Sequence, residues 1–262
     1  MTPLTLLRAV ASGAGSLAPV HAALGTVLDA IEPGHAVARV PRLPPHRLRG
    51  PGIVPVLGDL VLSAAVTSSL AAGLRISTLT LHTAMLGPLP PPGEALVARS
   101  YLVAPAGTTA VSRAEVFAAD SRAVAHLTAR SAVLSSDGEG ALFHDPPDPD
   151  PFSALETELR AASTLANSVG GVQGGVLAAV VGHRLTAALP NGVACDHDVT
   201  FVRSVPADGA GMAVEVEVRH GGRRLVAADA RLRDSGGRVA VLAAATVWQP
   251  ESPTPDVESR HR

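Results

Sequence analysis

Hydrophobic positions alternate with polar ones in several short runs of the chain. In the run 212–219, a methionine and three valines fall on one face, and Glu215, Glu217 and Arg219 fall on the other. This period of two is typical of a half-buried antiparallel strand, and the RHGGRR sequence that follows predicts a hairpin turn. Similar runs predict strands at 76–86, 95–104, 109–119, 124–134, 193–205, 212–220, 223–233 and 239–248.

Two longer segments are apolar on nearly every side. One covers 53–72 and follows a Gly-Pro-Gly sequence, and the other begins at Gly174 and Gly175 and runs to 189. A helix that is apolar all round must be enclosed, so we expect each helix to be wrapped by a sheet. Charged residues interrupt both segments, so neither is predicted to span a membrane.

The same order of elements occurs in both halves of the chain, which indicates an internal repeat. Each half has one enclosed helix followed by four strands. The first copy, 1–135, also has an N-terminal helix and a hairpin over 26–41. In the second copy, 152–248, only the segment 152–165 occupies this place, and we expect it to be helical.

Two further segments carry no period of 2 or 3.6. The segment 136–151 is acidic and rich in proline, which predicts a linker between the copies. The segment 249–262 has three prolines and few apolar residues, and we expect a disordered tail.

Composition excludes several classes of partner. The chain has 262 residues, of which 47% are hydrophobic, and its net charge of −2 lacks the positive field that non-specific nucleic-acid binding needs. The single cysteine, Cys195, rules out an internal disulfide and suits the reducing cytoplasm, where we expect the protein. Alternation along a strand would separate Cys195 and His197 from the two neighbouring aspartates, so we expect no metal and no other cofactor.

Two motifs carry a family resemblance. The sequence NSVGGVQGGVLAAVVG, at 167–182, resembles the Asn, Gly, His-Gly-Gly signature that opens the central helix of PaaI-type hotdog acyl-CoA thioesterases. The sequence GPGIVPVLGDLVLSAAV, at 50–66, is similar to the same region, with Asp59 where the family has its catalytic carboxylate. The resemblance implies an α+β double hotdog, in which two antiparallel sheets each wrap a long central helix and form an intramolecular pseudo-dimer with a continuous sheet.

The two copies have lost complementary parts of such a site. Gly174 can donate its backbone N–H at the start of a helix, but Pro51 occupies the matching place in the first copy and has no N–H. Nine residues after Gly50 stands Asp59, whereas nine residues after Gln173 stands Gly182. The resemblance therefore implies one composite site, because in such dimers the helix start of one unit faces the acid of the other.

Each site residue has an expected role. Gly174, helped by Gly175, would polarise the thioester carbonyl. Asp59 would activate water or attack the carbonyl itself, and these two mechanisms stay open. Ser77, eighteen residues after Asp59, is expected to hold the water or the carboxylate.

Two polar residues of the second copy complete the expected site. Asn167 would orient the loop that opens the helix, or the thioester. Gln173 departs from the histidine of the family, and can donate and accept hydrogen bonds but cannot replace an imidazole.

The sequence thus predicts hydrolysis of an acyl-CoA or related acyl thioester at a single site between the copies. One alternative is a degenerate hotdog that binds acyl-CoA or a protein partner without catalysis, because Pro51, Gln173 and Gly182 depart from the family pattern. Another is a hotdog hydratase or dehydratase, although its Asp-x-x-Pro-x-His type of sequence is absent. The expected partner is the thioester substrate, and a homodimer of the pseudo-dimer stays open.

Overall fold

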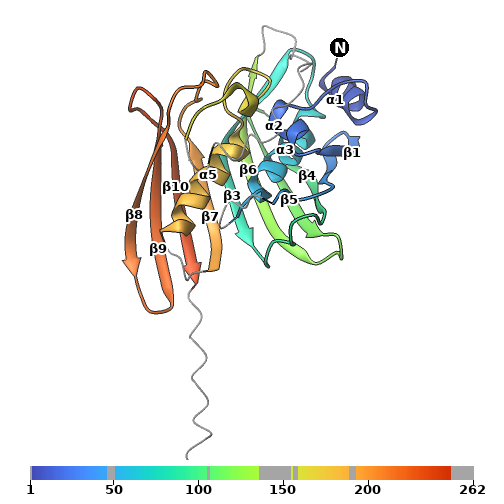
Figure 1. The fold of residues 1–262 in the computed structure, drawn as a ribbon. Helices are drawn as coiled ribbons and strands as arrows, with labels where there is room; N and C mark the ends of the chain where they lie inside the picture. The colour runs from blue at the N-terminus through green and yellow to red at the C-terminus, as the bar shows by residue number, and fades with distance from the viewer. Residues whose placement is uncertain are drawn as a thin grey trace, which may run out of the picture.

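The computed structural model describes residues 2–45, 51–104, 107–135, 155, 159–188 and 193–248. The strands of these residues form one antiparallel sheet, and two long helices lie side by side against one of its faces (Figure 1). The linker expected at 136–151 and the tail expected at 249–262 lie outside the described residues.

The first half contains the elements up to the end of the sixth strand. They are α1 (Pro3–Ala11), α2 (Pro19–Ala23), β1 (Val27–Glu32), β2 (His35–Val40), α3 (Val54–Thr67), β3 (Leu74–Met85), β4 (Leu96–Ala104), β5 (Thr109–Ala118) and β6 (Ala123–Ser135). The second half contains the 3-10 helix η1 (Ser163–Leu165), then α5 (Gly174–Ala187), β7 (Val193–Phe201), β8 (Ala213–Gly221), β9 (Leu225–Arg233) and β10 (Val239–Trp248).

The sheet is continuous across the two halves. Its strand order is β1-β2-β4-β5-β6-β3-β7-β10-β9-β8, so the halves meet where β3 pairs with β7. This pairing runs antiparallel from Thr80 opposite Thr200 to Ala84 opposite Asp196. The strands of the two halves therefore form two groups that share one seam.

Alternation along the strands gives the sheet a buried face and an outer face. In β9, the residues Val226, Ala228, Ala230 and Leu232 are buried, and the residues between them are less so. Strand β8 lies at the edge of the sheet, and its valines are only half-buried or exposed. The pattern of the predicted strand at 212–220 is thus retained with weaker burial, because an edge strand has one neighbour instead of two.

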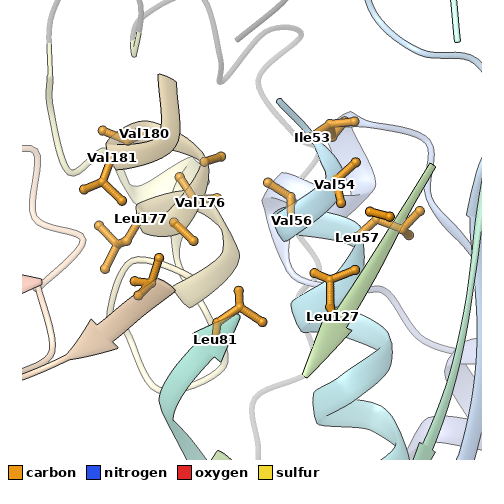
Figure 2. Close-up of a cluster of buried hydrophobic side chains, with 14 of the residues drawn as sticks. Ile53, Val54, Val56, Leu57, Leu81, Leu127, Val176, Leu177, Val180 and Val181 are labelled. Atoms are coloured by element: carbon orange, nitrogen blue, oxygen red, sulfur yellow. The ribbon is translucent and has the colours of Figure 1, made fainter. Parts of the chain in front are cut away.

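The two long helices form the centre of the core. Eleven of the fourteen residues of α3 and ten of the fourteen residues of α5 are buried. Helix α3 packs on the strands of the first half and α5 on those of the second half. Val56 of α3 and Val176 of α5 lie on facing sides of the two helices, and Leu81 of β3 lies beneath them (Figure 2).

Two predicted helices differ from those observed. Helix α3 ends at Thr67 and not at 72, and the chain then turns at Gly73, whose φ of +79° favours glycine, into β3. Of the helix expected at 152–165, Leu155 is α-helical, and the described part 159–165 is not. Its Ala161 N–H donates to the carbonyl of Ala210 instead of to a preceding turn, and only the short 3-10 helix η1 follows.

None of the helices in the described ranges combines the length and the apolar character that crossing a membrane requires.

Candidate active site

Asp59 lies in the second turn of α3 and is only 4% exposed. The residue before it, Gly58, lets the helix lie close to the sheet, since a Cβ there would stand 2.5 Å from Leu127 of β6. Figure 2 shows Leu127 beside α3. Burying a carboxylate without hydrogen-bond partners costs free energy, so a buried Asp59 needs donors around it.

Three donors surround the Asp59 carboxylate. Thr78 of β3 donates its hydroxyl to Oδ1 at 3.0 Å. Gln173 donates its side-chain amide to Oδ2 at 2.7 Å, and the backbone N–H of Gly175 donates to the same oxygen at 3.0 Å. The carboxylate belongs to the first half of the chain, and two of its three donors belong to the second half.

Close contact between the helices makes this arrangement possible. A Cβ on Gly175 would stand 2.4 Å from the carbonyl oxygen of Pro55 and 2.7 Å from the Cα of Val56. Both atoms belong to the backbone of α3, which cannot move aside cheaply. Only glycine at this position therefore brings the start of α5 within reach of Asp59.

Gly175→Ala is expected to lower the free energy of unfolding by about 1–3 kcal/mol, because the added methyl pushes the two helices apart. Gly174→Ala is the matched control, since a Cβ there meets its nearest neighbour, the Asp59 carboxylate, at 3.2 Å. Urea denaturation of both variants measures the difference. Equal stability of the two variants would contradict the backbone contact.

The first turn of α5 leaves one N–H group without a partner. The N–H groups in the first turn of any α-helix have no acceptor within that helix. The N–H of Gly175 donates to Asp59, and that of Val176 donates to Oε1 of Gln173 at 2.9 Å. Among the described residues, no hydrogen bond is found for the N–H of Gly174, which is half-buried. This group is free to donate to a ligand beside Asp59.

Gln173 links the first turn of α5 to the Asp59 carboxylate. Because its Oε1 accepts from a backbone N–H, its amide nitrogen must face the Asp59 carboxylate. The side chain is therefore the N-cap of α5 and a donor to the acid at once. Both functions use only the side-chain amide of Gln173.

Asn167 holds the loop that leads into α5. Its Oδ1 accepts from the N–H of Val169 at 3.0 Å and from the N–H of Gly171 at 3.1 Å. The loop is also bonded to its neighbours, since the N–H of Val172 donates to the carbonyl of Val205. Of the two roles expected for Asn167, this geometry fits the orientation of the loop.

Ser77, the hydroxyl expected beside Asp59, lies on the exposed side of β3, and Thr78 takes its place. Successive strand residues point to opposite faces, so only one of these two neighbours can face α3. The pairing of β3 with β6 is irregular between Thr78 and Thr80. A bulge of this kind reverses the alternation that would identify the inward residue from sequence.

The N–H of Gly175 also differs from its expected role. We expected it to help polarise a carbonyl, but it donates to Asp59. Gly174 is left as the donor for a ligand.

The surroundings of Asp59 raise its pKa. Burial is the largest cause, because it disfavours the charged form, while the hydrogen bonds from Thr78 and Gly175 act in the opposite direction. The carboxyl group is therefore a better proton acceptor than an exposed aspartate, which suits general-base chemistry.

The start of α3 lies against α5 and β7. Gly182 of α5, which stands nine residues after Gln173, packs there, since a Cβ on it would be 2.6 Å from the ring of Pro51. His197 of β7 lies beside it, with its Nδ1 3.4 Å from the same point. The proline ring fills the space, so this side is closed.

His197 is buried and neutral. Its side chain is 2% exposed, and neither ring nitrogen has a hydrogen-bond partner among the described residues. Burial lowers the pKa of His197 from its ordinary value of 6.5 to about 4, although Asp198 raises it slightly. Burial also lowers the pKa of His21 to about 4.

Acid is expected to destabilise the protein through these histidines. Between pH 6.5 and 4 the unfolded chain binds protons that the folded chain does not, so the free energy of unfolding falls as the pH falls. His197→Leu removes one such group and should reduce this loss by roughly 3 kcal/mol. Urea denaturation at pH 7 and pH 4 measures it. Identical pH dependence of the variant and the wild type would contradict the burial of a neutral His197.

Among the described residues, no group of three or more His, Cys, Asp or Glu side chains is arranged to hold a metal ion.

Solved structures of known proteins share this architecture. A Mycobacterium avium subsp. paratuberculosis protein described as tesB is 16% identical, with a TM-score of 0.58 over 90% of this chain and 99% of that chain. The chain has the fold of hotdog thioesterases. A Lactobacillus plantarum protein provisionally described as an oleoyl thioesterase is 12% identical, with a TM-score of 0.59 over 84% of this chain and 97% of its own.

A third hotdog neighbour covers a similar share of the chain. The acyl-ACP thioesterase of Bacteroides thetaiotaomicron is 10% identical, with a TM-score of 0.55 over 82% of this chain and 98% of its own. The hotdog likeness thus spans both halves of the chain. No protein-family model matches the sequence, and no curated protein matches it.

Proposed function

We propose that the protein hydrolyses an acyl-CoA or a related acyl thioester at a single composite site between two hotdog units of an intramolecular pseudo-dimer. The observation that carries the proposal is the set of bonds on Asp59. A carboxylate of the first half accepts hydrogen bonds from Gln173 and Gly175 of the second half. The thioesterase names of the structural neighbours support the same reaction class.

Asp59 acts as the general base. A carboxylate offers about four lone-pair directions, of which the protein donors use three, so one direction remains for a water molecule. The three donors also hold both carboxylate oxygens in place. Direct attack by either oxygen would require breaking bonds to these donors, so we favour activation of water over an anhydride.

The Gly174 N–H polarises the thioester carbonyl. It lies one residue before the N–H that holds Asp59, so a carbonyl oxygen bound there has its carbon beside the activated water. Water attacks this carbon and its proton passes to Asp59, while the negative charge on the oxygen is stabilised by Gly174 and by the positive end of the helix dipole. Collapse of this intermediate breaks the carbon–sulfur bond, and the thiolate receives the proton from Asp59.

Thiol release from acyl-CoA substrates of several chain lengths tests the proposal. We expect the wild type to release thiol and free acid in equal amounts. Binding of acyl-CoA without release would favour a non-catalytic hotdog. Addition of water to the double bond of an unsaturated acyl-CoA, with the thioester intact and no thiol released, would favour a hydratase.

Thr78→Val is expected to lower kcat by about 10-fold to 100-fold, because the carboxylate loses the hydroxyl donor that holds its Oδ1 in place. Ser77→Ala is the matched control, since it removes a hydroxyl one residue away on the exposed side of β3. The two rates are compared in the same thiol-release assay. A larger loss in Ser77→Ala than in Thr78→Val would reverse the assignment of the hydroxyl.

A further inference from the structure

The route by which a substrate reaches Asp59 follows from which of its neighbours are exposed. Asp59 is 4% exposed and Gln173 is 6% exposed, and Gly175 is buried. Thr78 and Gly174 are half-buried, and both border the carboxylate. A substrate therefore approaches along the side that these two residues share.

The opposite side of the carboxylate is closed at the helix contact. The backbone of α5 at Gly175 touches that of α3 at Pro55 and Val56, and this leaves no room for a chain of carbon atoms. An acyl group cannot pass between the helices at this point, so it must extend from Gly174 in another direction.

Phe201 lies beside Gly174. It is the last residue of β7, and its ring Cζ lies 3.5 Å from the point that a Cβ on Gly174 would occupy. The Asp59 Oδ2 lies 3.2 Å from the same point. The unpartnered N–H of Gly174 therefore belongs to a residue flanked by the carboxylate and by an aromatic ring.

The ring is held by its strand. Phe201 pairs with Val241 of β10, and the N–H of the next residue, Val202, donates to the carbonyl of Ala240 at 2.8 Å. The side chain is half-buried and packs against the main hydrophobic core. The backbone of Phe201 is thus held by β10, and its ring rests on the core.

We propose that Phe201 selects the acyl group of the substrate, by excluding branches on the carbon next to the carbonyl. The inference rests on the proposed function, in which the carbonyl oxygen accepts from Gly174. The carbonyl carbon then has its two substituents, the sulfur and the α-carbon, beside this glycine. An apolar wall matches the apolar acyl side, whereas the thiol side of CoA carries polar amides. The α-carbon therefore faces the ring, and a branch on it meets the ring.

The substrate class that follows is a linear acyl thioester. A single misplaced methyl group in a fitted apolar site changes kcat/KM by about 10-fold to 200-fold. We therefore expect the wild type to prefer a linear acyl-CoA over its 2-methyl isomer with the same number of carbons by at least about tenfold. Phe201→Ala should reduce this preference at least about tenfold, mainly through a faster reaction of the branched isomer.

The test compares linear and 2-methyl-branched acyl-CoA isomers at several chain lengths. Phe117→Ala is the matched control, because this phenylalanine lies on β5 with its ring 5.6 Å from the guanidinium of Arg99, outside the site. It should leave the preference unchanged. Phe201→Leu guards against loss of folding and should give an intermediate preference.

A binding measurement separates this inference from the proposed function. Affinities of the two isomers are measured on Asp59→Asn and on Asp59→Asn combined with Phe201→Ala, so no turnover is needed. The inference is supported if Asp59→Asn binds the linear isomer more tightly than the branched one and the double variant binds both equally. This result supports it even where the wild type releases no thiol and the proposed hydrolysis fails. Equal affinity of the two isomers for Asp59→Asn, or a preference that survives Phe201→Ala, overturns it.

Discussion

Asp59→Asn is expected to lower thiol release from acyl-CoA by about 10³-fold while the fold is retained, because the substitution removes the proton acceptor. The asparagine oxygen can still accept from Gln173 and Gly175, and its amide can donate to the hydroxyl of Thr78. The variant should be at least as stable as the wild type, since burial already raises the pKa of Asp59 and disfavours its charge. Steady-state kinetics and urea denaturation of the same preparation measure both effects.

Asp29→Asn provides the control for this substitution. Asp29 lies on β1, is partly exposed and pairs with Arg39 at 3.0 Å, so its loss should leave turnover unchanged. Exposed pairs of this kind contribute little to stability. Thiol release by Asp59→Asn at more than a tenth of the wild-type rate would exclude Asp59 as the base.

Gly174→Pro is expected to lower thiol release by about 10²-fold to 10³-fold, because proline has no N–H to donate to the developing oxyanion. The backbone accepts proline at this position. Gly174 is the first residue of α5, where proline is favoured, and Gln173 has a ψ of 135°, which suits a residue before proline. The fold should therefore persist, and circular dichroism with urea denaturation checks this.

Gly174→Ala separates the N–H from the space around it. Alanine keeps the donor and adds one methyl group, which would lie 3.2 Å from the Asp59 carboxylate and 3.5 Å from the ring of Phe201. We expect a much smaller loss of kcat than in the proline variant. Equal losses in the two variants would mean that crowding, and not the missing donor, accounts for the effect.

The sequence predicts the strands and the two enclosed helices well, because their patterns depend on burial alone. The alternating runs become the strands β3 to β10, and the segments apolar on all sides become α3 and α5. The helix predicted at 152–165 does not continue through 159–165, because this part bonds to the chain near Ala210, a contact that no local pattern reveals. Tertiary contacts override helix propensity there.

The candidate site is predicted only as far as its residues follow from spacing. Counting along the two copies brings Asp59, Gln173 and Gly175 into one hypothesis, and the structure brings these residues into contact. The choice between Ser77 and Thr78 depends on an irregular strand pairing that counting cannot detect. Phe201 carries no motif and is found only from its position beside Gly174.

A crystal structure with a non-hydrolysable acyl-CoA analogue is the most direct test of the composite site. The analogue's carbonyl oxygen should lie about 2.7–3.1 Å from the backbone nitrogen of Gly174. A water molecule bound to Asp59 should lie about 3–3.5 Å from the carbonyl carbon. A carbonyl bound away from the start of α5, with Asp59 still covered by its protein donors and no water beside it, would contradict the account.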